Sequence, residues 1–304
     1  MEESAKAKTN YVLPASIILA AVIFSVAWVY DIGRKTPANQ SAKLSQSEQT
    51  DLDIVLEEKV LPKNGVELPV KWGDLGIKMT ESGVIDTAQF EALYADRGGL
   101  DDNSKKLLYG RDNGAIVINR DNSGVILNLF WALGLGNKNS ILEEGPMMDS
   151  EYGGAGNFAS TGGWTLARGG AMNHYSMHQF MKLTPEQQAA VERVSNGIYR
   201  PCCGNSTYFP DCNHGMAMLG LLELMASQGV SENDMYKVAL AVNSYWFSDT
   251  YLTIAKYMQS QGVDWSKVDP KQVLGEGFSS SRGYQDILSK TKPVKRTSGG
   301  GCGV

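Results

Sequence analysis

Hydrophobic and polar positions divide the 304-residue chain into distinct stretches. Residues 12–30 form an apolar run without a charge, and residues 31–51 are polar with few large apolar side chains. From Leu52 to Leu288, apolar residues recur at helical spacing, and no linker interrupts them. The pattern predicts a mainly α fold, with an N-terminal transmembrane helix, a polar tether, and a single mostly helical globular domain with at most a short β element.

The expected boundaries follow these changes in composition. Residues 1–30 would be a membrane anchor, 31–51 the tether, 52–288 the helical soluble domain, and 289–304 a flexible tail that is rich in glycine and contains Cys302. In such a tail Cys302 could act as a resolving thiol, a fourth metal ligand or a carrier arm, or it could be a spare cysteine.

The apolar run Val12–Tyr30 is the candidate membrane anchor. Its nineteen residues, at about 1.5 Å of rise per residue, reach roughly 28 Å, which is near the thickness of a bilayer core. The triplet Ser25–Ala27 would also suit signal-peptide cleavage, but the run is longer than a usual signal core. We therefore expect a single-pass membrane protein with an extracytoplasmic soluble domain, although lysine and arginine are nearly balanced on the two sides of the run.

Capping residues predict where several helices begin and end. Asp86 can cap a short helix that carries Phe90 and Leu93 on one face. Thr184-Pro185-Glu186-Gln187 has the sequence of a capping box with proline at the first helical position, and this helix should stop near Asn196-Gly197.

Further helices are expected in the C-terminal half. Their predicted starts and stops are Asp211 or Asn213 to Gly229, a start at Ser231, and Ser248 or Asp249 to Gly262. Earlier in the chain, Ala115–Asn119 resembles a strand, and a turn at 122–124 leads into an apolar segment that ends at Gly134 and Gly136. This last segment is interpreted as a buried helix.

Composition limits the kinds of partner. The chain is 42% hydrophobic and 20% charged with a net charge of −5, values of a globular protein that can bury a core without disulfides. It carries no long basic patch, which argues against nucleic acid as the main partner.

Three of the four cysteines lie in one short loop between two predicted helices. Cys202 and Cys203 are followed by eight residues, Cys212, one residue and His214. As thiolates, the three cysteines could join His214 around a metal ion, and the start of a helix would favour Cys212 as an anion. Cys3His is a known zinc arrangement, and thiolate-rich sets also suit Cu(I).

The remaining two histidines lie upstream of this loop. His174 and His178 are four residues apart, so in a helix they would share one face and could extend the metal site. Several methionines accompany the cluster and favour copper slightly over zinc. Met216, Met218 and Met225 are nevertheless expected to pack the core rather than bind metal.

These residues predict a membrane-anchored metal-binding protein for binding, delivery or detoxification of copper or zinc, whose partner is the metal ion or a metal-donor protein. One alternative is a thiol–disulfide redox protein that pairs Cys212 with Cys202 or Cys203. Another is a helical enzyme or scaffold in which the loop holds only a structural disulfide.

Motifs of common enzymes do not settle the function. The sequence contains no Gly-x-Ser-x-Gly and no His-Glu-x-x-His. The glycine-rich stretch 153–170 matches neither nucleotide-binding fingerprint. It is expected to be a long loop over the helical core, with a lid beside His174 as its functional alternative.

Overall fold

The computed structural model describes residues 46–294, with side chains described from Leu52 onward. The chain divides into two compact units, Met1–Asp51 and Leu52–Val304. The expected anchor, most of the expected tether, and Cys302 lie outside the described residues. Within residues 46–294, no helix combines the length and the apolar character needed to cross a membrane.

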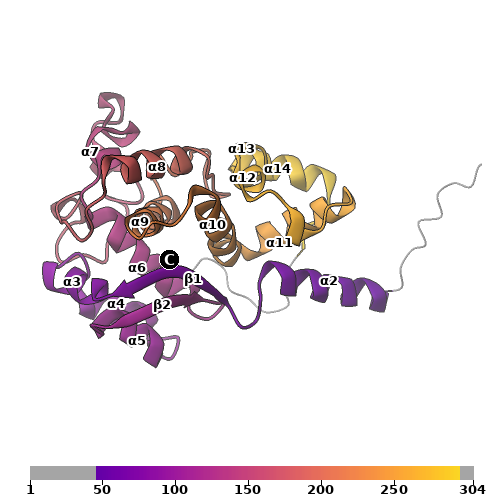
Figure 1. Ribbon diagram of the computed structural model, residues 1–304, viewed down its shortest axis with the longest axis horizontal. Coiled ribbons are helices and arrows are strands. Elements are labelled where there is room, and N and C mark those ends of the chain that lie inside the picture. The colour runs from indigo at the N-terminus through magenta and orange to yellow at the C-terminus, as the bar shows by residue number, and fades with distance from the viewer. Residues whose placement is uncertain (1–45, 295–304) are drawn as a thin grey trace, which may run out of the picture. The chain divides into compact units, whose positions relative to one another are not determined.

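The second unit is mainly helical, as predicted (Figure 1). The helices of residues 46–294 are α2 (Gln46–Val60), α3 (Leu75–Ser82), α4 (Thr87–Ala95), α5 (Asp102–Tyr109), α6 (Ser123–Gly136), α7 (Ser140–Glu144), α8 (Pro185–Asn196), α9 (Asn213–Ser227), α10 (Glu232–Trp246), α11 (Ser248–Ser260), α12 (Pro270–Leu274), α13 (Glu276–Ser279) and α14 (Ser281–Lys290). Short 3-10 turns occupy the stretch between α7 and α8.

A two-stranded antiparallel sheet accompanies the helices. It pairs β1 (Val66–Gly73) with β2 (Asn113–Ile118), with Val66 opposite Ile118 and Gly73 opposite Asn113. The β-like run expected at Ala115–Asn119 is confirmed as β2. Strand β1 was not expected, although its buried residues Leu68, Val70 and Trp72 alternate with more exposed ones in the way that predicts a half-buried strand.

Helices α6 and α9 form the centre of the unit. Every residue from Val125 to Gly136 and from His214 to Ala226 is buried. A Cβ atom on Gly134 would lie 2.1 Å from the Met216 carbonyl oxygen, and one on Gly220 would lie 2.4 Å from the Phe130 carbonyl oxygen. The two backbones therefore touch where the helices cross, which only glycine allows.

The predicted caps are largely confirmed. Asp86 accepts a hydrogen bond from the Gln89 amide at 3.0 Å, and both bonds of the Thr184 capping box are present. Gly229 and Gly262 adopt positive φ angles of 77° and 78° after their helices. The start of α9 differs from the prediction: its N-cap is Cys212, whose side chain makes no capping hydrogen bond, rather than Asp211 or Asn213.

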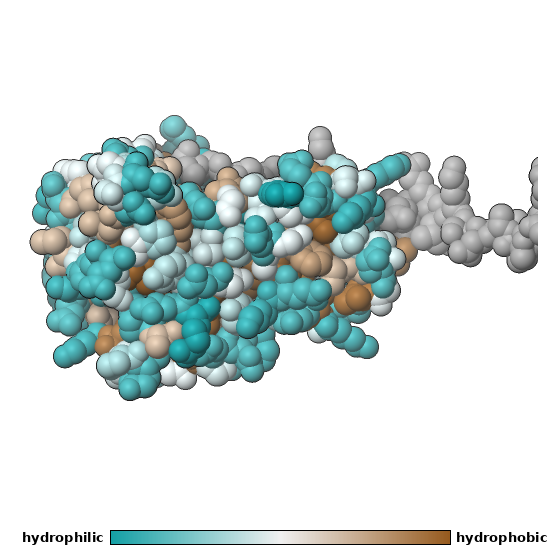
Figure 2. Space-filling model, turned by 90° about the horizontal axis from the view of Figure 1, so that it is seen from above, coloured by the Kyte–Doolittle hydropathy of each residue, from teal (hydrophilic) through white to brown (hydrophobic). Residues whose placement is uncertain are grey.

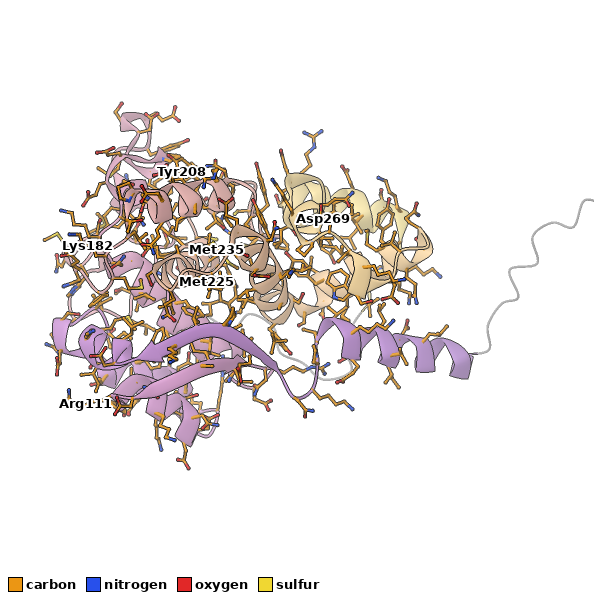
Figure 3. The ribbon with its side chains drawn as sticks, viewed as in Figure 1. Arg111, Lys182, Tyr208, Met225, Met235 and Asp269 are labelled. Atoms are coloured by element: carbon orange, nitrogen blue, oxygen red, sulfur yellow. The ribbon has the colours of Figure 1, made fainter. Side chains whose placement is uncertain are left out.

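Three methionines that the sequence predicted to be buried do lie in the core. Met216, Met218 and Met225 are at most 1% exposed, which confirms that they pack the core. Figure 3 shows Met225 and Met235 among the packed helices and Lys182 and Arg111 at the periphery. On the face drawn in Figure 2, hydrophobic residues form small, separated patches among hydrophilic ones.

Candidate metal centre

The cysteine loop connects α8 to α9 and is fixed at several points. It folds back on itself through a hydrogen bond from the Thr207 amide to the Ile198 carbonyl at 2.8 Å. Ser160, from the glycine-rich stretch, donates through its amide to the Asp211 carbonyl at 3.1 Å and through its hydroxyl to the Pro210 carbonyl at 2.7 Å. The glycine-rich stretch therefore supports the loop just before Cys212.

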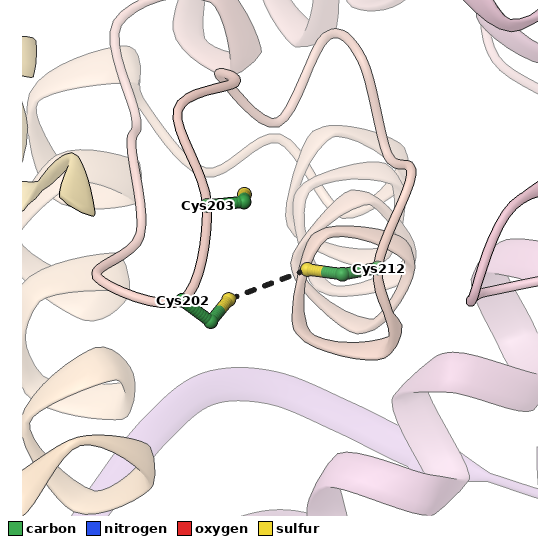
Figure 4. Close-up of side chains that lie close together, drawn as sticks. All are labelled: Cys202, Cys203 and Cys212. Carbon is green, nitrogen blue, oxygen red and sulfur yellow. Dashed lines mark hydrogen bonds between the residues drawn. The ribbon is translucent and has the colours of Figure 1, made fainter.

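The three cysteines of the loop converge. The sulfurs of Cys202, Cys203 and Cys212 all lie within 4.8 Å of one another, and the Sγ atoms of Cys202 and Cys212 are 3.4 Å apart (Figure 4). A disulfide would need about 2.05 Å, and all three are free thiols. Cys202 is exposed, while Cys203 and Cys212 are half-buried, so the cluster lies at the surface on the Cys202 side.

Arg200 lies beneath the cluster and is only 1% exposed. Its Nε donates to the Cys212 sulfur at 3.0 Å, and its Nη2 donates to the Asp211 carboxylate at 2.5 Å. Further hydrogen bonds reach the carbonyl oxygens of Asn205 at 3.1 Å and Phe209 at 2.9 Å. The loop is therefore wrapped around a buried guanidinium, a role that the sequence did not reveal because arginine is seldom fully buried.

The surroundings of Cys212 favour its thiolate. Hydrogen bonds from Cys202 and Cys203 hold the pKa of Cys212 well below its usual range, and the charge of Arg200 and a hydrogen bond from His214 add to this effect, which outweighs burial. Cys212 also occupies the N-cap of α9, where the helix dipole favours an anion. Hydrogen bonds to Cys203 and Cys212, together with burial, raise the pKa of Cys202. One thiolate shared with protonated neighbours is the resting state that this arrangement supports.

His214 lies beside the cluster rather than within it. Its ring packs 4.3 Å from that of Phe247 and 6.0 Å from that of Trp246, centroid to centroid, and the residue is 8% exposed. Among the described residues, the group of three or more potential ligands that could hold a metal consists of Cys202, Cys203 and Cys212 alone. His214 therefore supports Cys212 by hydrogen bonding, and the structure does not bring it into that group.

His174 and His178 contact each other at a separate position. They do not lie in a helix: His174 follows the 3-10 turn Ala171–Asn173, and His178 forms an isolated bridge with Asn137. Their ring nitrogens nevertheless meet, with Nδ1 of His174 3.0 Å from Nε2 of His178. The structure joins the two histidines, but it does not join them to the three sulfurs.

The spacing of the sulfurs suits a single metal ion. With metal–sulfur bonds of about 2.3 Å, sulfurs around a tetrahedral or trigonal ion are roughly 3.8 to 4.0 Å apart. The Cys202 and Cys212 sulfurs, 3.4 Å apart, would have to separate slightly to reach this value, and no pair of the three sulfurs is more than 4.8 Å apart. The same proximity also allows a disulfide between Cys202 and Cys212. Comparison of the chain with protein-family models, with curated proteins and with solved structures finds no match.

Proposed function

We propose that the described domain binds a thiophilic transition metal ion through Cys202, Cys203 and Cys212, for binding, delivery or detoxification of that metal. The observation that carries this proposal is the convergence of three sulfurs within 4.8 Å. Thiolates are the preferred ligands of soft ions such as Cu(I), and zinc accepts them as well.

Cu(I) fits the cluster better than zinc. Cu(I) accepts three thiolates, whereas a structural zinc site requires four ligands, and His214 is not within the group of sulfurs. Three thiolates and Cu(I) carry a net charge of −2. The adjacent Arg200 offsets part of this charge and donates a hydrogen bond to one ligand.

Exposure of Cys202 favours transfer over permanent storage. A thiolate of a donor or acceptor protein would approach the cluster at Cys202, its exposed residue, because Cys203 and Cys212 are half-buried. The proposed partner is therefore a metal-donor or acceptor protein. A membrane anchor at residues 12–30 would hold the domain beside a membrane, with the extracytoplasmic side proposed for the domain.

Anaerobic titration of the full-length chain with Cu(I) against a chromophoric competitor tests this function. We expect one equivalent per chain and X-ray absorption with sulfur neighbours at about 2.2 to 2.3 Å. Cys212→Ser should abolish tight binding, whereas the matched variant Cys302→Ser should preserve it if the tail cysteine is not a ligand. Less than half an equivalent of Cu(I), or binding unchanged by Cys212→Ser, would overturn the proposal.

Thiol–disulfide exchange is a second candidate, favoured by the 3.4 Å between the Cys202 and Cys212 sulfurs. In this reaction the Cys212 thiolate attacks a partner disulfide, which forms a mixed disulfide and releases one partner thiolate. That thiolate takes the proton of Cys202, whose sulfur then attacks the Cys212 sulfur, so that a Cys202–Cys212 disulfide forms and the second partner thiolate leaves. Two electrons pass from the domain to the partner.

Equilibration of the metal-free protein with reduced and oxidised glutathione distinguishes this candidate. Mass spectrometry after alkylation should show a Cys202–Cys212 bond that forms and breaks within the potential range of the glutathione couple. A cluster that stays fully reduced across that range argues against exchange and leaves metal binding as the function of the thiols.

A further inference from the structure

We infer that His174 and His178 form a second metal site, separate from the thiols, for a borderline divalent ion of the Zn(II) and Cu(II) class. This inference does not depend on the function of the cysteine cluster. It rests on the geometry of the two imidazoles, on the groups that orient them, and on the backbone that holds them.

The two ring nitrogens already have nearly the spacing of two ligands on one ion. Nδ1 of His174 and Nε2 of His178 face each other at 3.0 Å. Bonds of 2.0 to 2.1 Å to a tetrahedral ion place ligand nitrogens about 3.3 to 3.4 Å apart. A shift of a few tenths of an ångström would therefore admit the ion between the rings.

The other nitrogen of His174 is held in the way that metal-binding histidines usually are. Nε2 lies 3.0 Å from the Arg168 carbonyl oxygen, which can only accept, so Nε2 carries the proton. The lone pair of neutral His174 is then on Nδ1, directed at His178. A backbone carbonyl that fixes the tautomer of a ligating imidazole is a common outer-sphere partner of metal sites.

The proton that lies between the two rings can move to another nitrogen when a metal ion binds. With the His174 lone pair on Nδ1, the 3.0 Å contact places a proton on Nε2 of His178. When a metal ion binds, that proton moves to Nδ1 of His178 through solvent, and both facing nitrogens then present lone pairs.

The backbone between the histidines is held in an unusual conformation. Ser176 has a φ angle of 55°, and among the described residues it is the one non-glycine residue with positive φ. Hydrogen bonds from its amide to the Leu135 carbonyl at 2.9 Å and from the Asn139 amide to its hydroxyl at 3.1 Å stabilise this turn. On the far side, the His178 amide donates to Gly136 and its carbonyl accepts from Lys138, at 2.8 and 2.7 Å. The turn therefore returns the chain so that the two rings meet.

Solvent can complete the coordination sphere. His178 is half-buried, and Met177, between the two histidines, is 67% exposed. Water or the Met177 thioether would fill the remaining positions. Imidazoles suit zinc and copper, whereas soft Cu(I) favours thiolates, so the two sites would bind different ions from a mixture.

Histidine-selective NMR of the full-length chain tests this site, because the chain contains only three histidines. The thiols are first blocked by reversible methylthiolation, and a Cys202→Ser/Cys203→Ser/Cys212→Ser variant repeats the measurement without the modifying reagent. Zn(II) alone is then added. We expect one equivalent to shift the His174 and His178 ring signals together while the His214 signal stays unchanged.

Two variants test whether His174 and His178 bind one zinc ion together or bind zinc independently of each other. His178→Gln should weaken Zn(II) binding at His174 at least tenfold, and the exposed control Lys182→Gln should leave it within twofold. Ring signals that stay unshifted in tenfold excess of Zn(II), or a His174 affinity that His178→Gln changes by less than twofold, would overturn the inference. Neither result bears on Cu(I) binding by the thiols.

Discussion

Two fully buried ionisable side chains, Arg200 and Glu223, show how differently one domain treats charge. Arg200 belongs to the loop before α9, packs against Gly215 at the start of that helix, and contacts the Asp211 carboxylate, the Cys212 sulfur and two carbonyl oxygens. Glu223 is part of α9 itself, where Asn137 and Asn139 donate to its two oxygens at 2.8 and 2.7 Å. Among the described residues, no cation contacts Glu223.

This difference in partners determines the charge that each side chain keeps. Burial disfavours the charge of Arg200, but the neighbouring Cys212 and Cys203 sulfurs and Asp211 outweigh it and raise the pKa of Arg200 above its usual value. Burial raises the pKa of Glu223 well above its usual value, and the two asparagine amides only partly oppose this. A buried charge therefore persists where an opposite charge meets it, and it is weakened where only amides do.

Removal of the guanidinium should have the largest effect. Arg200→Met removes one donor each from the Asp211 carboxylate and two buried carbonyl oxygens, and it removes the cation beside Asp211, so we expect a loss of about 3 to 5 kcal/mol in the free energy of unfolding. Urea denaturation measures this loss. The control Arg193→Met, which removes a surface ion pair with Glu232, should cost far less, because solvent screens that pair. Equal losses for the two variants would show that the buried contacts of Arg200 contribute no more to the free energy of unfolding than a surface ion pair does.

The charge of Glu223 should appear in the pH dependence of stability. The folded pKa is raised, so its contribution is complete below the unfolded pKa of about 4.3 and is lost as pH rises through the folded pKa. The free energy of unfolding should fall by up to about 1.4 kcal/mol per pH unit in this window. Glu223→Gln should flatten the curve, whereas the control Glu232→Gln, at a partly exposed carboxylate, should not. An unchanged slope in Glu223→Gln contradicts the assignment.

The smallest effect concerns the thiolate beside Arg200. Cys202→Ala removes a hydrogen bond to Cys212, so the pKa of Cys212 should rise toward its usual value. Thiolate absorbance at 240 nm across pH measures this shift, with Cys302→Ala as the control. In the intact protein, the depressed pKa adds stability that is present above the unfolded pKa of about 8.5 and is lost as pH falls through the folded pKa. A Cys212 that titrates identically in Cys202→Ala would show that the hydrogen bond from Cys202 does not stabilise the thiolate.

Local signals predicted much of the helical fold. The capping box at Thr184 and the cap at Asp86 depend on a few adjacent residues, so the sequence alone indicates them. The burial of α6 also follows from its continuous apolar sequence. Strand β1 was not predicted, although buried and exposed residues alternate along it. The predicted N-cap of α9 was wrong by one residue, because Asp211 and Asn213, which often cap helices, flank the actual N-cap Cys212.

The candidate site was only partly predictable. A loop that joins two packed helices brings its ends together, which explains why the convergence of Cys202, Cys203 and Cys212 could be expected. Arg200 could not, because its burial depends on carbonyl groups that only the folded loop directs inward. The spacing of His174 and His178 suggested a helix, whereas the left-handed turn at Ser176 brings them together by long-range hydrogen bonds.

The close backbone contact at Gly134 and Gly220 fixes the position of α9 against α6. Because a single methyl group at either glycine would collide with the facing backbone, the helix has almost no freedom to slide or roll against α6. Cys212 is the N-cap of this helix and Glu223 lies within it, roughly 16 Å farther along its axis at about 1.5 Å per residue. The position of the Cys212 sulfur is therefore fixed by the packed core as well as by the loop.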